Sequence, residues 1–135
     1  MDKYLFRGKQ IVSNEWVEGY FYKAKYYRDD TELCCYITTP YPNEYNRPSD
    51  DCMVIPETVG QFTGLTDKNG VKIFEGDIIK ERIWDEVCVG TFRKIDKISV
   101  VIFKKGMFSY NTQPMNNLTI EVIGNIHDNP ELLNS

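Results

Sequence analysis

The chain has 135 residues, of which 41% are hydrophobic and 27% are charged, close to the averages of folded globular proteins. It is long enough for one domain, or for one domain with a small appendage, and its composition excludes a disordered chain. The apolar runs are too short to span a membrane, and the start MDKYLFRGK lacks the apolar centre of an export signal, so we expect a cytoplasmic protein.

Charge is unevenly spread along the chain, although the net charge is only −4. From Met1 to Arg28, six basic residues stand against three acidic ones, which gives +3. From Asp29 to Glu57, one arginine stands against seven acidic residues, which gives −6. A uniformly basic surface of the kind that binds nucleic acid is therefore excluded for the whole chain, whereas a local one at the N-terminal end is not.

The first part of the chain predicts short antiparallel strands. Aromatic and β-branched residues dominate residues 4–7 and 15–22, and Ser13-Asn14 is typical of a turn, so these segments form a hairpin. Residues 32–39 predict a third strand on β propensity, and residues 53–55 a short fourth one. Period-two alternation divides the second strand into two faces, one with Trp16, Glu18, Tyr20 and Tyr22, the other with Val17, Gly19 and Phe21.

Residues 40–51, PYPNEYNRPSDD, interrupt this series of strands. Three prolines, two asparagines and several charged residues predict a long surface loop. Loops of this length without internal structure are often functional or simply disordered, and the sequence leaves open whether this one is ordered.

Two turns organise the middle of the chain. Asn69-Gly70 predicts a type I′ hairpin turn, because both residues tolerate the positive φ that this turn requires. Residues 61–66 should then pair with residues 71–74. Next, Glu75-Gly76-Asp77 predicts a sharp corner leading into a strand over residues 78–83. Small SH3-like barrels use corners of this kind.

Several short strands are predicted beyond this corner. Residues 84–86 should bridge to a strand over residues 87–92, in which Gly90 indicates a bulge. Asp96-Lys97 predicts a turn. The following strand, residues 99–104, contains a continuous apolar run that predicts burial on both faces.

The end of the chain predicts two further strands and one helical turn. The strands cover residues 107–110 and 118–126, and the second of them closes the sheet. Asn129-Pro130-Glu131 has the pattern of a helix start, but only a single turn can follow. That turn should pack Leu132 and Leu133 onto the barrel.

Three strings carry a family resemblance. They are YLFRGKQIVSNEWVEGYFY at the start, GQFTGLTDKNGVKIFEGDIIK in the middle and EVIGNIHDNPELL near the end. Together they resemble the YopX family of small proteins from bacteriophages and prophages of low-GC Gram-positive bacteria. The resemblance implies a β-rich fold, a phage origin and a bacterial host cell, and it supplies no catalytic residue. Residues 25–53 and 80–118 match no recognised part of the family pattern.

These patterns together predict a mainly β fold with little helix. We expect an N-terminal aromatic β-hairpin region with the acidic, proline-rich loop over residues 1–52. Residues 53–135 should form a small SH3-like barrel with the C-terminal helical turn.

Catalysis is not expected, and neither is a cofactor or a metal site. The sequence has no phosphate-binding glycine loop, nucleophile elbow or metalloprotease motif. Asp77 should cap its own turn, Glu75 should be solvated, and His127 should lie where the last strand meets the terminal turn. The four cysteines form no Cys-x-x-Cys pair, so we expect buried or half-buried free thiols in strands at Cys34, Cys35, Cys52 and Cys88.

The candidate interaction surface is the tyrosine-rich N-terminal half, because eight of the nine tyrosines precede Asn46. We expect protein binding or self-assembly there, as a homo-oligomer or with a phage or host protein. Nucleic-acid binding is the alternative, since basic and aromatic side chains interleave in this half. The candidate residues are Tyr4, Arg7, Tyr20, Tyr22, Lys23, Lys25, Tyr26, Tyr27 and Arg28.

Overall fold

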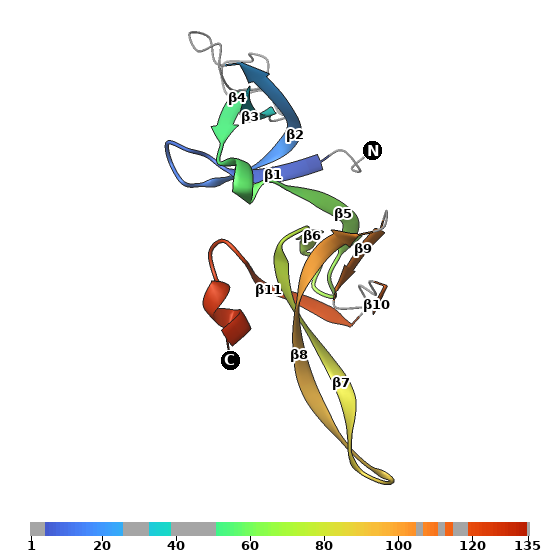
Figure 1. The fold of residues 1–135 in the computed structure, drawn as a ribbon. Helices are drawn as coiled ribbons and strands as arrows, with labels where there is room; N and C mark the ends of the chain where they lie inside the picture. Colours follow the sequence, from blue (N-terminus) through green and yellow to red (C-terminus); the bar gives the residue numbers. More distant parts are fainter. Residues whose placement is uncertain are drawn as a thin grey trace. The chain divides into compact units, whose positions relative to one another are not determined.

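The computed structural model describes residues 5–25, 33–38, 51–104, 107–110, 113–114 and 119–134. The chain divides into two compact units, Met1–Phe62 and Thr63–Ser135. Each unit is built from antiparallel strands and has its own hydrophobic core. Figure 1 shows the strands in the order of the sequence.

The N-terminal unit is a curled sheet of short strands. Its elements are β1 (Leu5–Lys9), β2 (Trp16–Lys25), β3 (Leu33–Thr38), β4 (Asp51–Val54), the 3-10 helix η2 (Pro56–Thr58) and the start of β5 (Gly60–Thr66). The strand order is β4-β3-β2-β1-β5. The predicted first hairpin is present, and Asn14 in its turn has a φ of 63°.

β4 closes this sheet by meeting the end of β1. Ile11 N–H donates to the carbonyl oxygen of Met53 at 3.0 Å, and Ile55 N–H donates to that of Lys9 at 2.8 Å. The core contains Cys35, Ile37 and Val54. The sequence assigned residues 53–55 to the second part of the chain. Here Met53 and Val54 pair with β3, Ile55 bonds to β1, and all three belong to the N-terminal unit.

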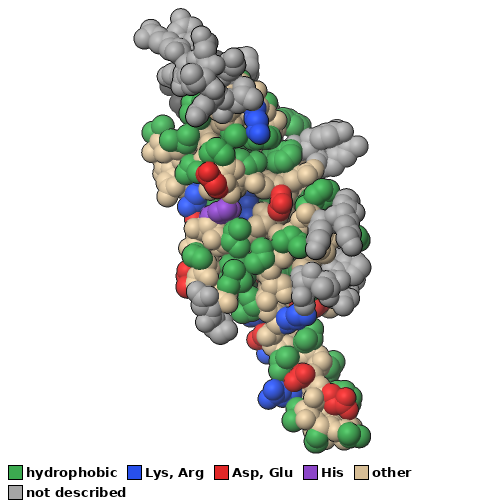
Figure 2. All heavy atoms as spheres, in the orientation of Figure 1, with side chains coloured by type: hydrophobic (Ala, Val, Ile, Leu, Met, Phe, Trp, Pro, Cys, Tyr) green, Lys and Arg blue, Asp and Glu red, His purple; other side chains and the backbone are tan. Residues whose placement is uncertain are grey.

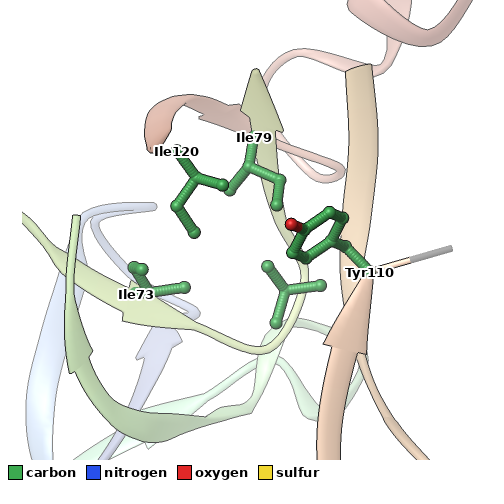
Figure 3. Close-up of a cluster of buried hydrophobic side chains, with 5 residues drawn as sticks. Ile73, Ile79, Tyr110 and Ile120 are labelled. Carbon is green, nitrogen blue, oxygen red and sulfur yellow. The ribbon is translucent and has the colours of Figure 1, made fainter. Parts of the chain in front are cut away.

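The C-terminal unit is a second curled sheet. After β5 come β6 (Lys72–Phe74), β7 (Asp77–Cys88), β8 (Thr91–Lys104), β9 (Met107–Tyr110), β10 (Gln113–Pro114) and β11 (Ile120–Asn125). Five of these strands form a sheet in the order β10-β9-β8-β7-β11. Its core, drawn in Figure 3, is formed by Ile73, Ile79, Val101, Tyr110 and Ile120.

Gly76 makes the predicted corner between β6 and β7. Its φ of 92° lies in the left-handed region that favours glycine. Its N–H donates to the carbonyl oxygen of Val101 at 2.9 Å, and its own carbonyl accepts the N–H of Ile126 at 3.0 Å. Asp77 accepts the N–H of Phe74 at 2.8 Å, so it caps its own turn as expected.

The prediction of a mainly β protein with a small curled, barrel-like sheet and little helix is confirmed. The terminal helical turn is also present, as the 3-10 helix η3 (Pro130–Asn134). His127 lies between β11 and η3, where the sequence placed it. The predicted loop over residues 40–51 falls almost entirely outside the described residues, and Asp51 begins β4.

Four local predictions are wrong. Gly70 has a φ of 84°, but Asn69 is not among the described residues with positive φ, so the turn is not type I′. Residues 84–86 do not separate two strands, and Asp96-Lys97 is not a turn, because β7 and β8 pair continuously through both positions. Gly90 lies at the tip of the resulting hairpin, and the bulge lies between Glu86 and Cys88.

Candidate interaction site

The end of the β7–β8 hairpin projects beyond the sheet to which it belongs. β11 pairs with β7 only up to Glu81, and β9 pairs with β8 only from Val101 onward. Residues 82–96 therefore form a two-stranded ribbon with no third strand among the described residues. We call this ribbon the arm; Figure 1 shows it at the bottom of the view.

Polar pairs across the two strands hold the arm together. Arg82 Nε lies 3.2 Å from Asp96 Oδ1, and Arg93 Nε lies 3.5 Å from Asp85 Oδ2. All four side chains are largely exposed to solvent, so each pair contributes little stability by itself. At the tip, Gly90 N–H donates to Glu86 Oε1 at 3.2 Å.

Large apolar side chains cluster on the arm and remain exposed. Trp84 is 65% exposed, Val87 55%, Val89 98% and Phe92 56%. Figure 2 shows hydrophobic side chains among charged ones at this end of the molecule. An isolated two-stranded ribbon has marginal stability, and these side chains bury little surface within it. Exposed large apolar side chains gathered in this way are a feature of interaction sites.

A hydrogen-bond network fixes the base of the arm. Tyr110 Oη donates to Glu81 Oε2 at 3.0 Å, and Thr119 Oγ1 donates to the same oxygen at 2.6 Å. Burial, together with the hydrogen bond and the charge of Glu81, raises the pKa of Tyr110 to about 12. The network joins β7, β9 and the start of β11, so the arm leaves the sheet from a rigid base.

A shallow apolar groove lies beside this base. It has a volume of about 430 Å³ and is lined by Lys97, Ile98, Ser99, Val100, Ile102 and Leu133. Ile98 is 36% exposed and Ile102 38%, whereas Val101 is fully buried. The predicted burial of this strand on both faces is therefore wrong, and its outer face lines the groove.

The structure separates the tyrosines of the predicted surface from its lysines. Tyr20 and Tyr22 lie on the face of β2 opposite the core residues Val17 and Phe21. Lys23 alternates to the other face, and only the backbone of Lys25 is described. Arg7 lies beside Trp16, with its guanidinium carbon 4.8 Å from the ring centroid. Tyr4, Tyr26, Tyr27 and Arg28 lie outside the described residues.

Sequence reasoning missed the arm and the groove. The sequence held one signal of an exposed hairpin, a group of apolar residues close together around Gly90: Trp84, Val87, Val89 and Phe92. The sequence pattern instead indicated separate strands there. Both features depend on where the neighbouring strands end.

Few chemically reactive groups converge among the described residues. That part of the chain contains no group of three or more metal-binding side chains. The four cysteines are free thiols. Cys35 is buried and Cys34 and Cys52 are half-buried, but Cys88 is exposed, so the prediction of burial is wrong for Cys88. None of the helices in the described part is long and apolar enough to cross a membrane.

Together, these features define a small, mainly β protein with an arm that exposes large apolar side chains. A family model described as YopX protein matches residues 5–134, and the chain therefore belongs to the YopX family. The crystal structure of protein EF1440 from Enterococcus faecalis is similar to this chain, with 25% sequence identity and a TM-score of 0.53. The match covers 95% of this chain and 96% of that one. No curated protein matches it.

Proposed function

We propose that this protein is a phage accessory protein that works by self-assembly and not by catalysis, and that the arm is its main contact. The main observation that supports this proposal is the exposure of four apolar side chains on a ribbon with which no other described strand pairs: Trp84, Val87, Val89 and Phe92. The charged side chains of the arm are largely paired with each other. Apolar contact, which favours a protein partner, is therefore the main interaction left to it.

The groove supports a second copy of this chain as the partner. The tip of the arm extends roughly 20 Å beyond Glu81, as seven strand residues do. A tip held at that distance cannot fill the groove at the base of its own arm. The arm of another copy can, and Val89 or Phe92 would then cover Ile98, Ile102 and Leu133.

Light scattering after size-exclusion chromatography tests this proposal on the full chain. We expect the wild type to form oligomers whose size rises with concentration. The arm variant Val89→Ser/Phe92→Ser should remain monomeric, because it loses the apolar contact. Val12→Ser is the matched control, since Val12 is 97% exposed but lies in the N-terminal unit. It should assemble like the wild type.

Mixing two defective variants makes the test specific for arm and groove. Ile102→Lys disrupts the groove and leaves the arm intact, so this variant should also be monomeric. A mixture of the arm variant and the groove variant retains one intact arm and one intact groove, and it should form heterodimers. A monomeric wild type, or an arm variant that assembles normally, would contradict the proposal.

A further inference from the structure

Strand β8 has a long edge along which no described strand pairs. β7 pairs with one edge of β8, and β9 pairs with the other edge only from Val101 onward. Over residues 91–100 this second edge therefore lacks a pairing strand among the described residues. The unpaired backbone N–H and C=O groups of such an edge are a template for adding another strand.

The other edge of the arm, on β7, is less suited to pairing. β11 occupies this edge up to Glu81, and a bulge interrupts it between Glu86 and Cys88. Only residues 82–86 remain regular there, and bulges are one means by which proteins prevent edge pairing. The extra residue of the bulge belongs to β7, so β8 continues without interruption. The edge of β8 is therefore the one that can extend the sheet.

The length of this edge limits how a second copy of the chain can pair with it. An antiparallel partner along residues 91–100 must end before Val101, where β9 begins to pair. Backbone groups point alternately to the two edges of a strand, so two opposite residues must both point theirs toward the partner or both away from it. A two-fold pair of identical strands thus has one residue opposite its own copy. Near the middle of the edge, the candidates are Lys94, Ile95 and Asp96.

The charges of the strand select Ile95 as the residue on the axis. An axis at Lys94 or at Asp96 places two like charges directly opposite each other, which destabilises a sheet. An axis at Ile95 places Lys94 of each copy opposite Asp96 of the other, so two pairs of opposite charge form. It also places Phe92 of each arm opposite Ile98, which lines the groove of the other copy. The contact between arm and groove is then made twice.

One pair in this register has like charges, because Arg93 lies opposite Lys97 of the other copy. Each of these cations has an acidic neighbour on β7 of its own chain. Arg93 Nε lies 3.5 Å from Asp85 Oδ2, and Lys97 is opposite Glu81 in the β7–β8 pairing. These carboxylates reduce the repulsion between the two cations.

We infer that β8 pairs with β8 of a second copy over residues 91–99, with Ile95 on the two-fold axis, and that this contact forms a dimer. The inference rests on the self-assembly proposed above and specifies its geometry. Both copies use the same surface, so the contact is closed and assembly through it ends at two chains.

Cysteine cross-linking at the axis tests this pairing on the full chain. A Cys88→Ser background removes the exposed thiol of the arm, and Ile95→Cys then places two thiols opposite each other. Opposite Cα atoms in an antiparallel pair are about 4.5 to 5.5 Å apart, which a disulfide can span. Mild oxidation should convert most of this variant to a covalent dimer on a non-reducing gel. Arg93→Cys in the same background is the matched control. Its two thiols would be about 13 Å apart along the strands, so it should stay uncoupled.

Complementary charge reversals test the register independently. Lys94→Glu and Asp96→Lys each place like charges opposite each other twice, and each should weaken self-association on the order of tenfold in analytical ultracentrifugation. A mixture of the two variants has opposite charges at both pairs and should form heterodimers with the affinity of the wild type. This recovery would also show that both variants fold. Glu57→Lys reverses an exposed charge in the N-terminal unit and should associate like the wild type.

The results separate this inference from the proposed self-assembly. The β8 pairing is wrong if the wild type assembles and Val89→Ser/Phe92→Ser does not, while Ile95→Cys gives no more covalent dimer than Arg93→Cys. It is also wrong if the mixed charge variants associate no better than each variant alone. In both cases self-assembly through the arm would stand. A monomeric wild type would contradict both proposals.

Discussion

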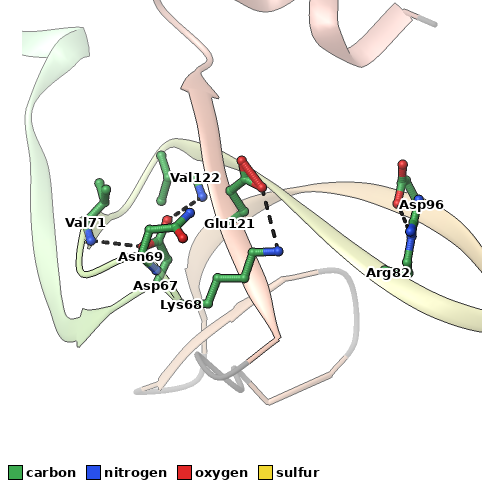
Figure 4. Close-up of polar contacts among 8 residues, drawn as sticks. All are labelled: Asp67, Lys68, Asn69, Val71, Arg82, Asp96, Glu121 and Val122. Atoms are coloured by element: carbon green, nitrogen blue, oxygen red, sulfur yellow. Dashed lines mark hydrogen bonds and ion pairs between the residues drawn. The ribbon is translucent and has the colours of Figure 1, made fainter.

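The Asp67 carboxylate accepts a hydrogen bond from the backbone N–H of Val122 at 2.9 Å, across 55 positions of the sequence. The same side chain accepts the N–H groups of Asn69 at 2.8 Å and Val71 at 2.9 Å. Figure 4 shows these contacts around the turn. Lys68 N–H adds a bond to the carbonyl oxygen of Ile120 at 3.1 Å. One buried carboxylate therefore shapes the β5–β6 turn and attaches it to β11.

Replacing Asp67 should destabilise the protein. Asp67→Ala leaves three backbone donors without this acceptor, and even one buried unsatisfied group costs about 1 to 3 kcal/mol. Asp67→Asn keeps one acceptor oxygen and should lose less. Urea denaturation measures both changes, with the exposed Asp85→Asn as control. Equal stability of Asp67→Ala and the wild type would show that the turn does not depend on this side chain.

Asp67 should also contribute to stability against acid. Burial raises the pKa of its carboxyl, but the hydrogen bonds from Val122, Val71 and Asn69 and the charge of Lys68 together lower it below the usual 3.8. Because the folded pKa is lowered, the stabilisation is present above the unfolded pKa and is lost as pH falls through the folded value. Denaturation midpoints below pH 4 should thus fall more steeply for the wild type than for Asp67→Asn.

Gly70 should be replaceable by asparagine but not by valine. Its φ of 84° strains a β-branched residue, while a Cβ atom there would meet nothing within 4 Å. The backbone alone thus sets the cost, about 1 to 2 kcal/mol for Gly70→Val. Gly70→Asn should be milder, because asparagine tolerates the left-handed region. Similar unfolding free energies for the two variants would show that backbone strain is not the cause.

The turn at Asp67 shows how far local sequence chemistry predicts this fold. Asn69-Gly70 correctly indicated a reversal there, because glycine at a positive φ is a local requirement. The turn type depends on hydrogen bonds from Asp67 to its own loop and to β11. Part of that interaction is tertiary, so the local pattern could not predict it.

The arm was unpredictable for a different reason. A strand packed on a core alternates apolar and polar residues, whereas both faces of the arm meet water and carry mixed residues. The pattern of Trp84 followed by two acidic residues, Asp85 and Glu86, therefore indicated a break between two strands. Conversely, the apolar run at residues 100–103 resembled a fully buried strand. Ile102 and Phe103 are 38% and 50% exposed, because the described elements beside this part of β8 cover it only in part.

Tyr110 should titrate abnormally and limit stability at high pH. Its pKa is raised to about 12 by burial and by Glu81. Because the folded pKa is raised, the stabilisation is complete below the unfolded pKa near 10 and is lost as pH rises toward 12. Ultraviolet absorbance should show one tyrosine ionising late. The late step should be missing in Tyr110→Phe, and if it remains, another tyrosine is responsible.

Core and arm substitutions should differ sharply in their effect on stability. Ile79 is 1% exposed and lies in the C-terminal core, so Ile79→Ala should cost about 2 to 5 kcal/mol. Val89 is 98% exposed, so Val89→Ala should change the unfolding free energy by no more than about 0.5 kcal/mol. Measurements on dilute, monomeric protein are required. A large loss for Val89→Ala under those conditions would mean that the arm tip packs within its own chain.

The terminal 3-10 helix should stabilise the C-terminal unit through its leucines. Leu132 and Leu133 line a cavity of about 230 Å³ with Asp96 and Ile98, so both face the outer side of β8. Leu133 is 43% exposed, and most of the effect should come from Leu132. Leu132→Ser/Leu133→Ser should cost about 1 to 2 kcal/mol, because both side chains are only partly buried. Glu131→Ala, in the same helix but exposed, is the control. An unchanged melting temperature of the double variant would show that the helix does not pack on the sheet.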